Sequence, residues 1–169
     1  AILAGHSLGE YSALVCAGVL SLKDGVRVVH QRGKSMQAAV AEGTGKMAAI
    51  VGLENYQINE ICDEAETVGA VSAANFNSPG QTVIAGETEA VDRAIVLCKE
   101  AGAKRALPLN VSVPSHCALM RPAAKKLETV LEGIEFNNPH TPVVQNVSAD
   151  IYADPEQIKQ NLIRQLYEP

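Results

Sequence analysis

A serine flanked by glycines lies near the start of the chain, directly after an apolar run. The segment Ala1-Ile2-Leu3-Ala4 leads into Gly5-His6-Ser7-Leu8-Gly9, and residues 11–20 follow with a helical pattern rich in small side chains. This order predicts a strand that turns abruptly into a helix, with Ser7 exposed at the corner. A serine so placed is typical of enzymes that use its hydroxyl as a nucleophile, although the same letters also occur in ordinary turns.

Two features of this turn favour nucleophilic chemistry. Gly5 and Gly9 would let the strand and the helix approach so closely that a Cβ at either position would clash. The backbone amide of Leu8 would lie at the positive end of the helix dipole, where it can donate to a developing oxyanion. We therefore expect Ser7 as the nucleophile and the Leu8 amide as an oxyanion donor.

A nucleophilic serine needs a neighbouring base, and His116 is the leading candidate. It lies in the segment 110–117, which Pro114 stiffens, at the entrance of a helix predicted over residues 118–131. An imidazole placed there can face a cleft and accept the serine proton. Cys117 is an alternative nucleophile, but adjacent residues rarely point at one another and no positive helix end is evident for it.

Arg32 is a charged residue in an apolar helical arc. The helix predicted over residues 22–41 carries an apolar stripe, with Val28 and Ala39 on its flank, and Arg32 projects between stripe and flank. A guanidinium in such a place needs either a protein carboxylate or an acidic ligand, and the residues alone leave both open. The stripe consists of Leu22, Val26, Val29, Gly33, Met36 and Val40.

The middle of the chain has a different pattern from the two ends. Residues 43–109 predict the order β-α-β-β-α-β, which is that of a ferredoxin-like lobe with no evident chemistry of its own. Residues 1–42 and 110–169 would form a second, discontinuous lobe, with a further strand over 141–148 and a terminal helix from Asp154-Pro155. The middle lobe would have strands at 47–51, 71–76, 82–85 and 105–109 and helices at 55–66 and 87–101.

Composition narrows the class of protein. The 169 residues are 47% hydrophobic and only 4% aromatic, without tryptophan, which suits an α/β fold. The formal net charge of −5 argues against nucleic-acid binding, and no apolar run approaches the ~20 residues that span a bilayer. We expect a cytoplasmic protein with neither nucleic acid nor membrane as a partner.

The cysteines show no metal-ligand spacing. They are far apart and irregularly placed, and three of them lie in helix-like surroundings rich in alanine and valine. We expect buried free thiols in a reducing compartment, and neither a metal nor another cofactor. The four are Cys16, Cys62, Cys98 and Cys117.

Four motifs taken together identify a known family. They are Gly5-His6-Ser7-Leu8-Gly9-Glu10, Gln31-Arg32-Gly33 with Met36-Gln37, Asn75-Phe76-Asn77-Ser78-Pro79-Gly80-Gln81, and Val113-Pro114-Ser115-His116-Cys117. In this combination the chain resembles the malonyl-CoA:acyl carrier protein transacylases of bacterial type II fatty-acid synthesis. The resemblance runs along essentially the whole chain and is far more specific than Gly-x-Ser-x-Gly alone.

The resemblance implies a fold and a reaction. It implies an α/β-hydrolase-like large lobe with an inserted ferredoxin-like lobe, and a monomer in the intact family member. Ser7 would take malonyl from malonyl-CoA and pass it to the phosphopantetheine thiol of acyl carrier protein, with His116 as base and acid. Arg32 would bind the malonyl carboxylate. For the partner of Arg32, the resemblance therefore favours an acidic ligand over a protein carboxylate. The family has no triad aspartate, and its histidine is held by backbone or amide groups of a C-terminal segment.

Two departures from the family pattern shape our expectations. An N-terminal strand with a Gly-Gln-Gly type motif, which supplies the second oxyanion donor, and further C-terminal strands are absent. We therefore expect a truncated piece with weak or no activity and about two parallel strands in the large lobe. Acyl choice is less constrained, because Leu8 resembles malonyl-selective members whereas Ser115 is also small in relatives that accept branched units.

Two other functions compete with this one. A general serine hydrolase or thioesterase would use the same serine, and an inactive fragment would only fold or dock acyl carrier protein. Because that carrier is acidic, a basic footprint is expected, and Arg121, Lys125 and Lys126 on the helix after His116 are the candidates.

Overall fold

The computed structural model describes residues 1–111 and 113–169, which divide into two compact units. The first comprises Ala1–Ser35 and Pro122–Leu166, and the second comprises Met36–Arg121 and Tyr167–Pro169. Residues 36–42 and 110–121 thus cluster with the middle of the chain, so the units differ in their bounds from the predicted lobes. Ser112, within the predicted extended segment 110–117, lies outside the described residues.

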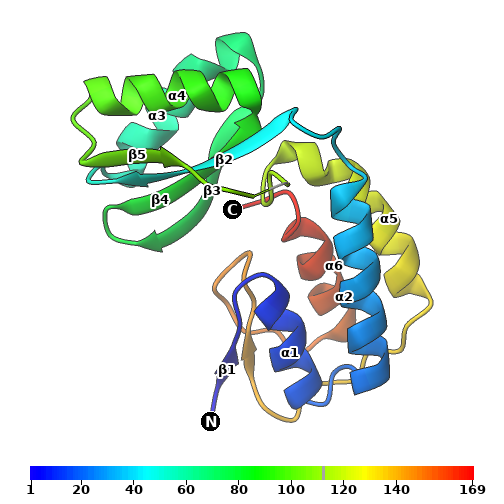
Figure 1. Ribbon diagram of the computed structural model, residues 1–169. Helices are drawn as coiled ribbons and strands as arrows, with labels where there is room; N and C mark the ends of the chain where they lie inside the picture. Colours follow the sequence, from blue (N-terminus) through cyan, green and yellow to red (C-terminus); the bar gives the residue numbers. More distant parts are fainter. Residues whose placement is uncertain (112) are drawn as a thin grey trace. The chain divides into compact units, whose positions relative to one another are not determined.

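The second unit is built on a four-stranded antiparallel sheet in the order β3-β4-β2-β5. Its elements follow one another as β-α-β-β-α-β, as the sequence predicts, and helices α3 and α4 pack on the sheet (Figure 1). The described elements are β2 (Gly45–Val51), α3 (Asn55–Ala65), the 3₁₀ turn η1 (Glu66–Val68), β3 (Val71–Ser78), β4 (Gln81–Glu87), α4 (Thr88–Glu100) and β5 (Arg105–Pro108).

Alternation along the strands fills both faces of this sheet. From β2, Ala48 and Ile50 enter the core shared with α3 and α4, whereas Met47 joins a smaller cluster with Cys117. Between β3 and β4 the chain turns at Pro79-Gly80, where Gly80 has a φ of 72°, a backbone angle that suits glycine.

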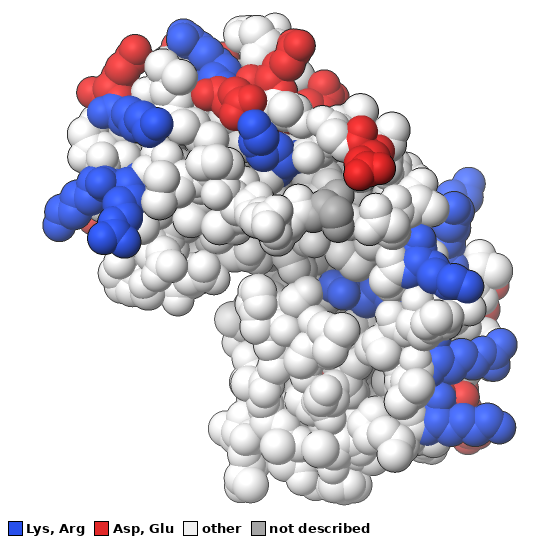
Figure 2. Space-filling model, in the orientation of Figure 1, with Lys and Arg blue, Asp and Glu red and all other residues white. Residues whose placement is uncertain are grey.

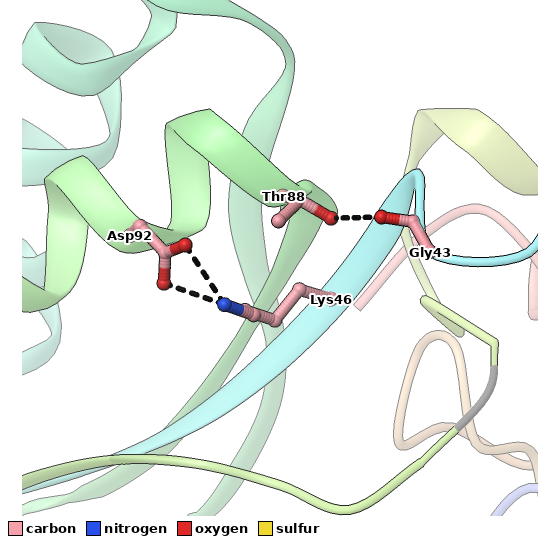
Figure 3. Close-up of polar contacts among 4 residues, drawn as sticks. All are labelled: Gly43, Lys46, Thr88 and Asp92. Atoms are coloured by element: carbon pink, nitrogen blue, oxygen red, sulfur yellow. Dashed lines mark hydrogen bonds and ion pairs between the residues drawn. The ribbon is translucent and has the colours of Figure 1, made fainter.

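Polar contacts tie the start of α4 to the entrance of β2 (Figure 3). The Thr88 hydroxyl donates to the Gly43 carbonyl at 2.7 Å, and Lys46 Nζ lies 2.7 and 2.8 Å from the two carboxylate oxygens of Asp92. Because the ion pair is solvent-exposed, it adds at most about 1 kcal/mol to stability. The fold of this unit therefore rests on its apolar core and its strand ladder.

The first unit contains a parallel strand pair with helices around it. Leu3 pairs with Val143 and Ala4 with Val144, which gives the two parallel strands that the sequence predicts. Its elements are β1 (Leu3–Ala4), α1 (Leu8–Cys16), most of α2 (Leu22–Gln37) and of α5 (Arg121–Glu132), β6 (Val143–Val144) and α6 (Pro155–Arg164). The mixed α/β class predicted from composition is confirmed by the two sheets and their helices.

The strand predicted over residues 141–148 is only two residues long, because the chain turns back immediately after β6. The Gln145 amide donates to the Asp150 carbonyl and the Ala149 amide donates to the Gln145 carbonyl, which closes a tight loop. Ala149 has a φ of 57° within it. An apolar run thus predicted a longer strand than the backbone bonds allow.

The predicted apolar stripe of α2 is only partly buried. Leu22 is 70% exposed and Val26 59% exposed, whereas Met36, at the other end of the stripe, is buried. Val28 on the flank and Arg32 are also buried. Leu22 and Val26 instead line an open apolar groove of 240 Å³, together with Leu8, Tyr11, Ser12, Val15, Cys16, Gly25 and Val29. The helix also ends at Gln37 rather than near residue 41.

Charge is unevenly distributed over the first unit. On the face shown in Figure 2, the surface over α1 and β1 carries no charged side chain, while basic side chains line the edge along α2 and α5. None of the helices in the described part of the chain is both long enough and apolar enough to cross a membrane.

Candidate active site

Ser7 occupies the corner between β1 and α1, as predicted. The strand ends at Ala4, the helix begins at Leu8, and Ser7 itself has a φ of 53° and a ψ of −109°. An L-residue rarely adopts a positive φ, so the surrounding structure must hold the serine in this conformation. Such strain is expected of a nucleophile on a sharp strand-to-helix turn.

Only one of the two flanking glycines is required by close packing. A Cβ added to Gly5 would lie 2.1 Å from the carbonyl carbon and oxygen of Gly9, so no other residue fits there. A Cβ on Gly9 would meet no heavy atom within 4 Å, so the predicted clash is wrong for Gly9. The carbonyl group of Gly9 lies close to Gly5, whereas a side chain on Gly9 would extend into open space.

The amides at the start of α1 differ in how they are used. The Ser7 amide donates to the Asn146 side-chain oxygen, and the Gly9 amide donates to the His6 carbonyl at 2.9 Å. Between them, the Leu8 amide makes no hydrogen bond to any described residue. A first-turn amide without an internal partner is what an oxyanion donor requires.

Arg32 lies against Ser7, the predicted nucleophile. It is 5% exposed, and its Nη2 donates to Ser7 Oγ at 2.8 Å and to Gln165 Oε1 at 3.1 Å. The guanidinium carbon also lies 5.7 Å from the centroid of the Tyr11 ring.

Of the two partners that the sequence leaves open for Arg32, the protein carboxylate is missing. No described acidic side chain forms an ion pair with the guanidinium, and its buried Nε has no hydrogen-bond partner. A buried cation with unused donors next to a serine is suited to an acidic ligand.

Three residues of this cluster were not predicted as site residues: Glu10, Asn146 and Gln165. Gln165 Nε2 donates to the Ser7 carbonyl at 3.1 Å and to Glu10 Oε2 at 2.6 Å. The same Glu10 oxygen accepts from the Asn146 amide at 3.1 Å. Glu10 belongs to the first of the quoted motifs, which was a usable signal, whereas no local pattern marks Asn146 or Gln165.

The environment of Glu10 acts on its ionisation. Burial raises the pKa of this carboxyl above its usual 4.5, because the charged form loses hydration. Hydrogen bonds from Gln165 and Asn146 and the charge of Arg32 lower the pKa and offset part of that effect.

His116 belongs to the second unit, while Ser7, Leu8 and Arg32 share the first. It lies in the loop before the 3₁₀ turn η2 (Ala118–Met120), is 3% exposed and has a φ of 59°. Outside glycine, positive φ occurs in the described residues only at Ser7, His116 and Ala149. The predicted nucleophile and the predicted base are thus both held in strained conformations, as is common at functional sites.

Cys117 is poorly suited to be a nucleophile. Its Sγ donates to the Pro114 carbonyl at 3.1 Å, and burial raises its thiol pKa to about 11, which leaves little thiolate at neutral pH. Cys62 and Cys98 are also buried free thiols, but Cys16 is exposed, which corrects the expectation of burial. No described group of histidine, cysteine and acidic residues could hold a metal ion.

One of the three residues of the predicted basic surface already contacts another side chain. The Arg121 guanidinium carbon lies 4.4 Å from the centroid of the Tyr167 ring, a cation–π contact, whereas Lys125 and Lys126 are exposed.

Comparisons with known proteins match this chain to acyl transferases. Residues 1–165 match the family described as acyl transferase domain. The malonyl CoA-acyl carrier protein transacylase of Escherichia coli strain K12 is 61% identical over 169 residues, which are 100% of this chain and 55% of that protein.

Solved structures agree with the sequence match. The crystal structure of an acyl carrier protein S-malonyltransferase from Vibrio cholerae has a TM-score of 0.98 at 61% identity, covering 100% of this chain and 55% of that one. A structure of a type II polyketide acyl-carrier protein in complex with its malonyl-transacylase has a TM-score of 0.98 at 62% identity, with coverages of 99% and 54%. The chain therefore spans about half the length of the relatives it matches.

Proposed function

Because this chain belongs to the acyl transferase domain family, we propose that the whole protein moves malonyl from malonyl-CoA to the phosphopantetheine thiol of acyl carrier protein. Similar proteins are named for malonyl transfer, and one similar structure contains a carrier protein. The observation that carries the proposal is the hydrogen bond from buried Arg32, which has no described carboxylate partner, to Ser7 Oγ at 2.8 Å.

The reaction would proceed through an ester on Ser7. His116 takes the Ser7 proton while Oγ attacks the thioester carbonyl, and the Leu8 amide donates to the resulting oxyanion. The C–S bond then breaks, and His116 returns the proton to the coenzyme A thiolate. In the second half the phosphopantetheine thiol loses its proton to His116 and attacks the ester carbonyl. The acyl C–O bond to Ser7 then breaks, His116 returns the proton to Oγ, and malonyl remains on the carrier protein as a thioester.

Arg32 would select the acyl group. A malonyl group on Ser7 Oγ ends in a carboxylate within reach of the guanidinium that already contacts that oxygen. A bidentate pair with that carboxylate would include the buried Nε of Arg32, which has no hydrogen-bond partner in the described structure. A general serine hydrolase is less well supported, because it has no use for a buried cation beside its nucleophile.

The proposal extends to architecture and location. Residues 43–109, within the second unit, would form the ferredoxin-like lobe. Residues 1–42 and 110–169 would form part of an α/β-hydrolase-like lobe. The intact protein would be a cytoplasmic monomer without cofactor.

The acidic carrier protein would be attracted by three basic residues of α5: Arg121, Lys125 and Lys126. Reversing their charges should raise the Michaelis constant for carrier protein at low salt, and an unchanged constant would refute this surface.

Transfer to a thiol distinguishes the proposed enzyme from a hydrolase. The chain is loaded with malonyl-CoA, freed of the thioester and mixed with either buffer or holo acyl carrier protein, and both proteins are followed by intact mass spectrometry. We expect malonyl to appear on the carrier much faster than it is lost to water. Equal loss with and without carrier would indicate a hydrolase or thioesterase.

A further inference from the structure

The side-chain amide of Gln165 is held in one orientation by its neighbours. It is fully buried, and its nitrogen faces two acceptors, Glu10 Oε2 at 2.6 Å and the Ser7 carbonyl at 3.1 Å. Only the nitrogen of an amide can donate, so the oxygen must point the other way. There it accepts from Arg32 Nη2 at 3.1 Å.

We propose that Glu10 is a positioning residue for Arg32: by accepting from Gln165 it keeps the amide oxygen toward the guanidinium, which is thereby fixed against Ser7. This inference rests on the proposed function and deepens it, because the fixed guanidinium is the group that would select a malonyl carboxylate. Guanidinium, amide and carboxyl form a chain of hydrogen bonds, in which Arg32 Nη2 donates to Gln165 Oε1 and Gln165 Nε2 donates to Glu10 Oε2.

Glu10 also supports the nucleophile from a second side. Its Oε2 accepts from the Asn146 amide, and the Asn146 side-chain oxygen in turn accepts from the Ser7 amide. One carboxyl oxygen therefore anchors two groups, Gln165 and Asn146, that each touch Ser7. Loss of the Glu10 oxygen would remove a direct partner of Gln165, whereas the Asn146 side-chain oxygen would still accept from the Ser7 amide.

Burial makes Glu10 an unfavourable residue for stability alone. The side chain is fully buried, and its Oε1 has no hydrogen-bond partner in the described structure. Burying a carboxyl so incompletely satisfied opposes folding, so stability does not explain its presence. The carboxyl of Glu10 instead has a role at the site, because it holds Gln165, which accepts a hydrogen bond from Arg32.

The test compares three variants of the 169-residue chain. Glu10→Ala removes the acceptor, and Glu10→Gln keeps an oxygen where Oε2 lies. Asn161→Ala is the matched control, because Asn161 is another buried polar residue of the first unit, and its side chain bonds Gln157 rather than this cluster. Initial rates of Ser7 acylation by malonyl-CoA and by acetyl-CoA are measured by intact mass spectrometry.

We expect Glu10→Ala to lower the malonyl rate by about 100-fold, the loss typical of a small misplacement, and to lower the acetyl rate far less. Glu10→Gln should rescue most of the malonyl preference, and Asn161→Ala should leave the ratio of the two rates unchanged. The inference is overturned if Glu10→Ala slows both thioesters equally or changes their ratio no more than Asn161→Ala does.

A second readout keeps the inference separate from the proposed function. Hydrogen exchange of the Gln165 side-chain amide, followed by NMR, should be about tenfold faster in Glu10→Ala than in wild type, because one charge-assisted hydrogen bond is lost. Unchanged exchange would overturn the inference. If neither this chain nor the whole protein reacts with either thioester, the proposed function fails, and the exchange rates alone decide whether Glu10 positions Gln165.

Discussion

The two units of this protein differ in how well their buried groups are satisfied. In the second unit, apolar side chains such as Ile50, Ile58 and Ile84 fill a core between sheet and helices. In the first, charged and polar groups are buried beside a two-residue strand pair. All of the buried side-chain atoms without a hydrogen-bond partner in the described structure lie in the first unit: Glu10 Oε1, Tyr11 OH, Arg32 Nε, Gln145 Oε1 and Asn161 Nδ2.

This difference separates stability from chemistry. Unsatisfied buried polar atoms and a positive φ at Ser7 are unfavourable for folding, and proteins retain such features where a site needs them. A satisfied antiparallel sheet has no such features and supplies stability instead. We therefore expect substitutions in the apolar core between this sheet and its helices to change folding alone, and those around Ser7 to change reactivity as well.

The largest effect is expected from Ile84→Ala in the core of the second unit. Ile84 is fully buried, and its truncation should lower the free energy of unfolding by about 2–5 kcal/mol. Burial raises the thiol pKa of Cys62 to about 12 and of Cys98 to about 11, so alkylation of these cysteines reports opening of the unit. Their labelling should accelerate strongly. The exposed position Val96 provides the control, since Val96→Ala should leave labelling nearly unchanged. Slow labelling in Ile84→Ala would contradict the assignment of stability to this core.

Gly5→Ala should destabilise the first unit by about 3 kcal/mol, because the added methyl would lie 2.1 Å from the Gly9 backbone. Gly9→Ala is the matched control, and in helix α1 it should be neutral or slightly stabilising. Chemical denaturation followed by circular dichroism measures both. Similar losses in the two variants would show that the turn is not packed as described.

Arg32→Gln should lower malonyl acylation of Ser7 by about 100-fold while acetylation falls much less, because only malonyl offers a carboxylate for charge-assisted hydrogen bonds. Arg32→Lys should recover only part of the loss, since lysine lacks the planar pair of donors. The ratio of the two acylation rates is the measurement. A variant with an unchanged ratio would mean that Arg32 does not choose the acyl group.

The smallest effect is a pH dependence from Glu10. Its pKa is raised by burial, so the folded state holds this proton more tightly than the unfolded state does. The free energy of unfolding should therefore fall as the pH rises from about 4.5 through the folded pKa, by about 1.4 kcal/mol for each tenfold difference in proton affinity between the two states. Glu10→Gln removes that loss, so its stability relative to wild type should increase with pH in denaturation series. A constant difference would argue against the raised pKa.

The sequence predicted the features that are set by interactions between residues close together in the chain. The strands and helices of residues 43–109 follow from alternation and from the turn at Pro79-Gly80, which act between near neighbours. Helical periodicity identified α2 but could not say which face is buried, so Leu22 and Val26 were misplaced. Ser7 and Arg32 were predicted from their types and motifs. Their contact with Gln165 joins residues 133 or more positions apart, and no local pattern predicts it.

We propose that Ser7 is a nucleophile beside a guanidinium that holds a malonyl carboxylate. The most direct test is intact mass spectrometry of the chain after brief incubation with malonyl-CoA or acetyl-CoA, beside Ser7→Ala. We expect a malonyl adduct that forms faster than the acetyl adduct and is absent from Ser7→Ala. An adduct that persists in Ser7→Ala, or an acetyl adduct that forms at least as fast as the malonyl one, would contradict the claim.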